Sequence, residues 1–237
     1  PISIAFSAIP SALSAVQLGL ISGFETLEFE ATNTLTGNVA LGISTEAGMD
    51  TVKLTGALTT DSAKQLTITA NSGFTLDMGA HTATGSDNDD LIISIVGAAN
   101  AGTNDIVNLK VQNITGNITN AGFHIDNVET LNIDITGDAS HTYTISDIDG
   151  AQLSTINVSS SNPSAALLTA SDSLVITTAE STLIEVVDMS AMSGATTITG
   201  LASKLIATGA TVTGGSGVDA ITGGAGDDDV SFANTLT

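Results

Sequence analysis

The segment GGSGVDAITGGAGDDDVS, residues 214–231, is the most informative stretch of this 237-residue chain. It contains two successive nonapeptides of the pattern G-G-x-G-x-D-x-U-x, in which U is apolar. Glycine lets such a turn direct backbone carbonyl groups at a cation, aspartate supplies a carboxylate, and the apolar residue is buried. The segment therefore predicts a roll of short strands and turns whose oxygen ligands suit Ca²⁺. Its candidate ligand positions are Gly214, Gly215, Gly217, Asp219, Gly223, Gly224, Gly226 and Asp228.

Three weaker acidic turns lie upstream. In TGSDNDDLI, residues 84–92, Asp87, Asp89 and Asp90 crowd one turn, and like charges this close favour either a bound cation or a raised pKa. We include these three residues among the candidate metal ligands. For Asp50 and Asp105 we favour a simpler interpretation, in which an aspartate closes a β-turn through hydrogen bonds to its own backbone.

A second signal is a recurring pattern, apolar-x-x-(Leu/Ile)-x-apolar. Its central residue falls at positions 27, 66, 131, 156 and 205, with a weaker copy at 183. The later intervals are 25, 27 and 22 residues, and the earlier gaps of 39 and 65 are near two and three such units. A period of about 20–27 residues is the size of one solenoid coil. Alternating apolar residues in segments such as TVKLTG and LNIDITG indicate strands.

These patterns predict an all-β fold, a parallel β-solenoid that ends in the nonapeptide turns. We expect a solenoid over residues 1–204, with an irregular or short helical lead-in at about 10–23, and β-roll turns continuous with it over 205–237. An antiparallel β-sandwich of many short strands is the alternative, but the periodicity of the leucine pattern favours parallel stacking.

Composition restricts the partners. The chain has 4 lysines, no arginine and 25 acidic residues, for a net charge of −21. Nucleic-acid binding needs a basic surface and is therefore excluded, and anionic membranes repel such a chain. A divalent metal is the natural compensating charge. Cysteine is absent, which excludes disulfides and thiolate sites, and no apolar run is long enough for a transmembrane helix.

The nonapeptides resemble the RTX calcium-binding repeats of type I-secreted bacterial proteins. In that family two nonapeptides form one turn of a parallel β-roll, and Ca²⁺ lies between the loops of repeats n and n+2. This chain departs from the pattern, because the preceding nonapeptide LIATGATVT has Ala210 where the aspartate belongs. Each visible site is therefore expected to be half of a pair, completed by a neighbouring turn or by residues beyond Thr237.

The Thr/Ala/Gly-rich solenoid that precedes these repeats resembles, more narrowly, the RTX surface-layer proteins of Gram-negative bacteria. This resemblance implies a structural, calcium-binding protein, exported to the cell surface, that assembles with copies of itself into a two-dimensional lattice. Pro1 and the uncapped strand edges suggest a piece of a longer chain, which we expect either to continue into further coils at both ends or to pack against neighbouring subunits, with its surface anchor outside the fragment.

Two other functions share features with this sequence. An RTX adhesin or biofilm protein shares the same physics, although long stalks consist mostly of nonapeptides, which here occupy only a short stretch. A β-helix polysaccharide-active enzyme would need a general base aligned with cations on one face. The chain offers only scattered lysines and three lone histidines, His81, His124 and His141, for which surface or turn positions are the simpler interpretation. We therefore predict no enzymatic activity.

Overall fold

A computed structural model of the chain shows a parallel β-solenoid. The structure describes residues 3–6, 23–30, 32–44, 48–61, 63–84, 91–96, 104–111, 118–120, 123–135, 142–145, 148–160, 173–176, 184–192, 195–198, 209–221 and 226–232. Every regular element in these ranges is a strand, and every pairing between strands is parallel. The predicted fold class is therefore confirmed, and the β-sandwich alternative is wrong. The short helix expected near 10–23 lies outside the described residues, apart from Gly23 at its end.

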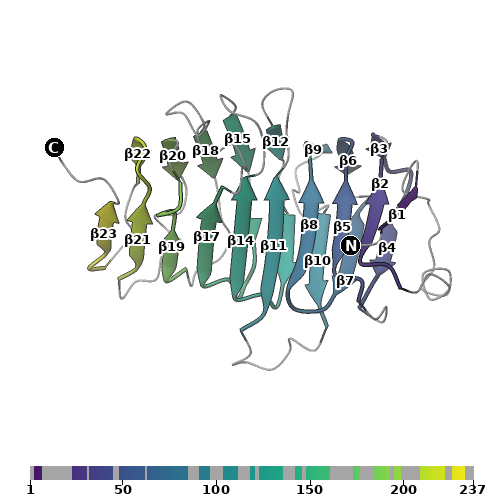
Figure 1. Cartoon of the computed structure of the whole chain (residues 1–237), viewed down its shortest axis with the longest axis horizontal. Helices are drawn as coiled ribbons and strands as arrows, with labels where there is room; N and C mark the ends of the chain where they lie inside the picture. Colours follow the sequence, from purple (N-terminus) through teal and green to yellow (C-terminus); the bar gives the residue numbers. More distant parts are fainter. Residues whose placement is uncertain are drawn as a thin grey trace.

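Sheet A contains ten strands and runs the length of the solenoid, as Figure 1 shows along its long axis. Its strands, in spatial order, are β1 (Ser3–Phe6), β2 (Thr26–Phe29), β5 (Thr51–Leu54), β8 (Phe74–Met78), β11 (Ile106–Val111), β14 (Thr130–Ile135), β17 (Thr155–Ser159), β19 (Val186–Asp188), β21 (Thr211–Gly214) and β23 (Asp229–Phe232).

The other faces of the solenoid are sheets B and C. Sheet B has eight strands: β3 (Asn33–Thr34), β6 (Leu58–Asp61), β9 (His81–Thr84), β12 (Ile118–Asn120), β15 (Thr142–Ile145), β18 (Ser173–Ile176), β20 (Ala195–Ile198) and β22 (Asp219–Ala220). Sheet C has five: β4 (Val39–Gly42), β7 (Leu66–Ala70), β10 (Leu91–Ile95), β13 (Phe123–Asp126) and β16 (Ile148–Asp149).

The cross-section of the coil changes along the chain. From β2 to β16 the strands follow the order A, B, C, so each coil has three sides. Beyond β16 the described strands alternate between sheets A and B only. The described strands of sheet C therefore end at β16, while those of sheets A and B continue to the glycine-aspartate segment.

The core consists of rows of aliphatic side chains that stack from coil to coil. Alternate residues of the sheet A strands from β2 to β21 point inward, and the register places each on its counterpart in the previous coil. Each buried Val, Leu or Ile contributes about 1.5–3 kcal/mol, so a row of six is a large stabilising term. One fully buried row is Leu27, Val52, Leu76, Leu109, Ile133 and Val158.

The register corrects part of the predicted leucine ladder. Leu131 and Ile156 do pair, 25 residues apart, as expected. Leu66, however, lies on sheet C between Val39 and Leu91, because a three-sided coil repeats the same apolar pattern on each side. The partner of Ile156 in the next coil is Val187, not Leu183, which is outside the described residues, as is position 205.

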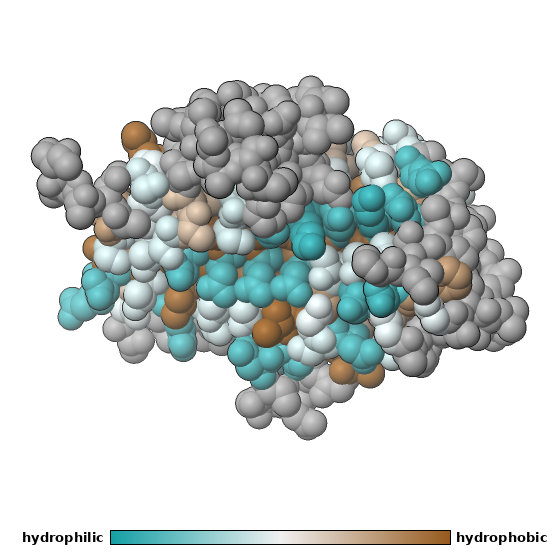
Figure 2. Space-filling view, in the orientation of Figure 1, coloured by the Kyte–Doolittle hydropathy of each residue, from teal (hydrophilic) through white to brown (hydrophobic). Residues whose placement is uncertain are grey.

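The outward face of sheet A carries polar ladders. Asn157 Nδ2 donates to Asn132 Oδ1 at 2.9 Å, and Asn132 Nδ2 donates to Asn108 Oδ1 at the same distance. Figure 2 shows a hydrophilic band across β11, β14 and β17, the strands that carry these residues. The row beside it alternates in charge along the solenoid, with the pairings Glu28, Lys53, Asp77, Lys110 and Asp134. The acidic chain thus neutralises part of its charge within this face.

We expect Asn132→Ala to destabilise the protein by about 1–2 kcal/mol, because it removes one hydrogen bond on each side of the ladder. Urea unfolding at pH 7 measures this change.

Asn132→Asp is the matched control, since its carboxylate accepts from Asn157 but, when ionised, donates nothing to Asn108. Its deficit should shrink at a pH where the new carboxyl is protonated. A native stability for Asn132→Ala would show that the ladder contributes nothing.

Candidate functional site: the glycine-aspartate turns

The two nonapeptides form the last described coil of the solenoid. β21 ends at Gly214, β22 begins at Asp219 and β23 begins at Asp229. Thr211 pairs with Asp229, and Val212 pairs with Val230, so this coil has 18 residues, whereas the neighbouring ladder step from Val187 to Val212 has 25. Two nonapeptides therefore make one turn, as the resemblance implied. We call the segments 214–219 and 223–228 the Gly-Asp turns, and of the second segment the structure describes residues 226–228.

Glycine is required where the first Gly-Asp turn lies on the coil before it. A Cβ added to Gly215 would be 2.2 Å from the carbonyl oxygen of Met192, which accepts a hydrogen bond from the Ser216 N–H at 2.8 Å. A Cβ on Gly214 would be 2.7 Å from Asp219 Oδ2 and 2.7 Å from the ring of Phe232. The backbone at Gly215 thus approaches the Met192 carbonyl as only glycine allows. The Asp219 carboxylate lies beside the neighbouring Gly214.

The second Gly-Asp turn is tied to the previous coil through Asp228. Its Oδ1 accepts a hydrogen bond from the Ala210 N–H at 2.9 Å. In sheet A, the register that pairs Thr211 with Asp229 places Ala210 opposite Asp228. In sheet B, the pairing of β20 with β22 places Thr196 opposite Asp219. In these two registers a threonine and an alanine, and no acidic residue, lie opposite the two aspartates in the coil before. This agrees with the departure from the repeat pattern seen at Ala210.

Several predicted ligands lie outside the described residues, namely Gly223 and Gly224 of the second turn and Asp87, Asp89 and Asp90 of the upstream turn. Gly217 and Gly226 are described and belong to the two Gly-Asp turns. Across the described ranges, no three His, Asp or Glu side chains converge as a ready-made metal site. Any cation held by these turns would therefore rely on backbone carbonyl oxygens as well as carboxylates, which is the ligand mixture that Ca²⁺ accepts.

Two residues near the Gly-Asp turns were missed by the sequence analysis. Met192 supplies the carbonyl under Gly215, and Phe232 packs on Gly214. Phe232 has a recognisable signal, because it follows the inward Val230 by two residues and so occupies the next inward position of a strand. Met192 has none, since any residue could provide its carbonyl oxygen.

Asp50 and Asp105 both make backbone hydrogen bonds to neighbouring coils. Asp50 Oδ1 accepts a hydrogen bond from the Thr51 hydroxyl at 2.9 Å. Asp105 is buried at a coil corner, where its N–H donates to Glu129 Oε2 at 2.9 Å and its carbonyl accepts from the Glu129 and Thr130 N–H groups. Both residues thus join neighbouring coils through their own backbone.

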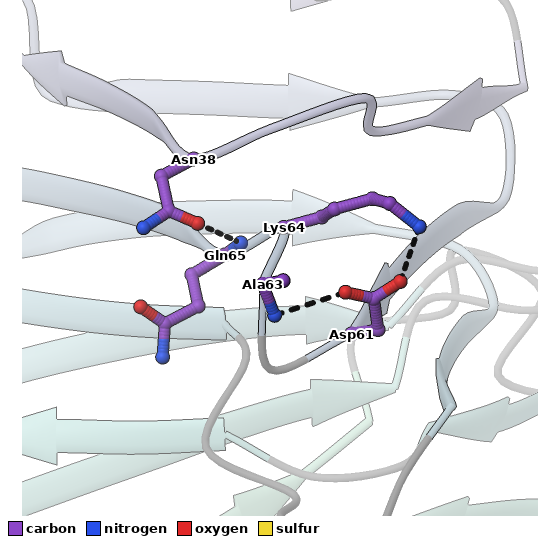
Figure 3. Close-up of polar contacts among 5 residues, drawn as sticks. All are labelled: Asn38, Asp61, Ala63, Lys64 and Gln65. Atoms are coloured by element: carbon purple, nitrogen blue, oxygen red, sulfur yellow. Dashed lines mark hydrogen bonds and ion pairs between the residues drawn. The ribbon is translucent and has the colours of Figure 1, made fainter.

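An acidic turn in the first half of the chain takes its positive charge from lysine. Lys64 forms an ion pair with Asp61, whose other carboxylate oxygen accepts from the Ala63 N–H at 2.9 Å (Figure 3). In the same view, Asn38 Oδ1 accepts from the Gln65 N–H at 3.0 Å and joins this turn to the previous coil. The hydrogen bond from Lys64, followed by that from the Ala63 backbone, lowers the pKa of Asp61.

Lysine is scarce beyond this region. Lys53 pairs with Glu28 at 2.8 Å, and Lys110 lies in the charged row of sheet A. After Lys110 the chain contains one lysine, Lys204, against 14 acidic residues. The Gly-Asp turns thus lie in the half of the chain where lysine is least available to balance carboxylates.

The histidines are separated. His81 on sheet B is 1% exposed, and its Nε2 lies 2.9 Å from the Thr60 hydroxyl. Its expected surface or turn position was wrong, because it is buried on sheet B, where it pairs with the buried Leu58 of the coil before. His124 is on sheet C, with Nε2 2.6 Å from Asp126 Oδ1, and His141 lies outside the described residues.

Comparisons with known proteins add no relative: no protein-family model, curated protein or solved structure matches the chain. Within the described residues, no helix has the length and apolar character needed to cross a membrane.

We expect Gly215→Ala to destabilise the protein by about 1–3 kcal/mol, because the methyl group would overlap a backbone carbonyl that has little room to move. Thermal unfolding followed by circular dichroism measures the loss.

The matched control is Gly42→Ala in β4, where an added Cβ meets nothing within 4 Å. It should be neutral or slightly stabilising. Equal effects of the two substitutions would contradict the close approach at Gly215.

Glu28 predicts a defined response to acid. The hydrogen bond from Lys53 holds the pKa of Glu28 below its ordinary value, against a smaller opposing effect of burial and with help from Thr55. A carboxyl with a lowered pKa stabilises the fold above its unfolded-state pKa, and this stabilisation disappears as pH falls through the lower folded-state value.

Glu28→Gln should therefore reduce stability at pH 7 and make little difference once pH is below the folded-state pKa. Urea unfolding between about pH 2.5 and pH 7 tests this in the native and Lys53→Met backgrounds. A pH-independent difference in the native background, or an undiminished one with Lys53→Met, would rule out the ion pair as its cause.

Proposed function

We propose that this protein is a structural, calcium-binding β-solenoid that assembles with copies of itself into an extracellular surface-layer lattice on a Gram-negative bacterium. The observation that carries the proposal is the 18-residue coil formed by the two nonapeptides, with glycine at the close approach to Met192 and aspartate at both edges. RTX-type calcium turns have this length and these residues.

The oxygen chemistry of the Gly-Asp turns fits Ca²⁺. Asp219 and Asp228 would supply carboxylates, and the glycine backbone of each turn would supply carbonyl oxygens. Ca²⁺ accepts six to eight such ligands with variable geometry, whereas Mg²⁺ demands a strict octahedron and keeps its water. Bound Ca²⁺ would neutralise charge that the scarce lysines cannot.

Calcium binding would stabilise the folded coil, since the unfolded chain does not hold these ligands together. At a free concentration one hundred times the dissociation constant, one site contributes about 2.7 kcal/mol. A surface lattice outside the cell meets millimolar calcium, which is within the range that weak extracellular sites use, about 10⁻⁴–10⁻³ M.

The test uses isothermal titration calorimetry and circular dichroism on EDTA-stripped protein, with Ca²⁺ and then Mg²⁺ as titrant. We expect binding and a gain in β-signal with Ca²⁺ only. Asp228→Asn should weaken binding about tenfold or more, because it removes a charge while its amide oxygen still accepts from the Ala210 N–H.

Asp50→Asn serves as the matched control, because Asp50 directly precedes β5, several coils away from the Gly-Asp turns, and it should bind Ca²⁺ as the native chain does. A stripped protein that is fully folded and indifferent to Ca²⁺ would contradict the proposal, as would an equal response to Mg²⁺.

A further inference from the structure

The outward face of sheet A between β2 and β17 is nearly neutral, although the chain carries a net charge of −21. Its charged row has one residue in each of five successive coils, and acids alternate with lysines: Glu28, Lys53, Asp77, Lys110 and Asp134. Three carboxylates and two ammonium groups give this row a net charge of −1. Copies of an acidic chain repel each other where acids dominate, so a balanced face is where two copies approach at low electrostatic cost.

A second outward row runs beside the charged row, two residues earlier in each strand. It carries hydroxyl groups on the first three strands and amide groups on the next three: Thr26, Thr51, Thr75, Asn108, Asn132 and Asn157. We call this the uncharged row. On β17, Ser159 pairs with Asp134 and so continues the charged row with a hydroxyl group.

Both rows reach solvent. Lys110 is exposed, and the remaining members of the two rows are half-buried. The Lys53 side chain is 31% exposed even though it pairs with Glu28. Figure 2 shows the hydrophilic band of this face across β11, β14 and β17. Because neighbouring strands lie about 4.8 Å apart, the two rows form a regular grid of polar groups.

The grid is complementary to a second copy of itself. Consider a two-fold axis that is parallel to the strands and passes between β8 and β11. It reverses the order of the coils and keeps each row opposite its own counterpart, so β8 faces β11 of the second copy, β5 faces β14 and β2 faces β17. Asp77 then faces Lys110, and Lys53 faces Asp134. In the uncharged row, every threonine faces an asparagine. Such an isologous contact is the commonest symmetric kind.

We propose that two copies of this chain dock face to face through the outward face of sheet A, about this two-fold axis, with their solenoids antiparallel. Each lysine of the charged row already has an acid on either side in its own sheet, and the contact adds one from the second copy. An axis through β8 itself would instead set Lys53 against Lys110 and Asp77 against its own copy. Like charges that face each other cost several kcal/mol, so the charged row fixes the register.

The area of the face makes this contact reversible. Six strands at a spacing of about 4.8 Å, each about five residues long at about 3.3 Å a residue, cover about 500 Å² on each copy. The total of about 1,000 Å² is at the low end for specific interfaces, where transient contacts are found. The inference rests on the self-assembly included in the proposed function and names a lateral surface for it, but it does not require calcium.

Sedimentation velocity of the 237-residue chain in EDTA, at protein concentrations up to about 1 mM, tests the docking. We expect the 23.6 kDa chain to dimerise at low salt and to dissociate at about 1 M salt, where the Debye length is about 3 Å. A chain that stays monomeric at low salt, or a dimer that salt does not weaken, overturns the docking. Calcium calorimetry on the same samples reports separately on the proposed function, because either result can fail while the other holds.

A charge swap locates the contact. Lys110→Glu and Asp77→Lys should each prevent dimerisation, because each sets like charges against each other on both sides of the axis. An equimolar mixture of the two variants should restore the dimer, since each new charge then faces an opposite one. Lys64→Glu is the matched control, because it changes the net charge equally in the turn between β6 and β7, away from sheet A, and should dimerise like the native chain. For variants with native circular dichroism, a mixture that stays monomeric overturns the assignment of the surface.

The register is tested by Thr75→Cys, which introduces the only thiol of the chain. In the proposed dimer the two thiols are offset by one strand spacing, about 4.8 Å, and a short bis-maleimide reagent should join them at low salt. Thr26→Cys is the matched control from the same row, because its own copy lies five strand spacings away, about 24 Å, and it should not crosslink. Equal crosslinking of the two variants, or association of Thr75→Cys without a crosslink, contradicts the two-fold arrangement.

Discussion

In-register parallel stacking of the coils is the constraint on which the rest of the structure depends. Each inner strand of sheet A forms backbone hydrogen bonds with the strand of the coil before and with the strand of the coil after. Inward residues must therefore lie on inward residues. Insertions can then occur only at the corners. The ladder step from Leu76 to Leu109 is 33 residues long, against 24 for the next step, yet the register across β8, β11 and β14 is unbroken. Residues that bind a ligand can therefore be accommodated in the turns, because the side chains there do not form the core.

Charge is distributed unevenly over this scaffold. In the first half, lysines serve individual carboxylates, as Lys53 does for Glu28 and Lys64 for Asp61. In the second half, some described acids accept from backbone donors, as Asp228 does from the Ala210 N–H, and others lie against side chains, as Asp126 does against His124. One hydrogen bond satisfies part of a carboxylate and leaves its charge in place. In the proposed function, a divalent cation bound at the turns supplies the remaining positive charge.

Much of the fold was predictable because stacking leaves a periodic signature. The recurring leucine pattern predicts the 25-residue step from Leu131 to Ile156. The length of two nonapeptides corresponds to the 18-residue coil. The assignment of Leu66 failed because all three sides of a coil carry the same alternation, so the pattern does not say which sheet a strand joins. Likewise, the spacing of the pattern predicts Leu183 as the partner of Ile156. The step between these coils is longer than the pattern predicts, and the partner is Val187.

The candidate site was predictable in its residue types and not in its surroundings. Gly214, Gly215, Asp219 and Asp228 could be read from the repeat, since each type has one physical task. The Met192 carbonyl could not, because a backbone oxygen has no sequence signature. The exposure of Phe232 depends on its being in the last described coil, which is a property of the stack. His81 is buried because its coil places it in an inward row, and a lone histidine does not reveal this.

Amide hydrogen exchange of the EDTA-stripped and calcium-loaded protein tests the central claim most directly, because it reports order coil by coil. The account predicts that Ca²⁺ slows exchange strongly in residues 211–232 and that the effect decreases with each coil toward the N-terminus, while β5, β8 and β14 change little. Protection of residues 211–232 that is already complete in EDTA, or that Ca²⁺ leaves unchanged, would contradict the claim that calcium orders the glycine-aspartate coil.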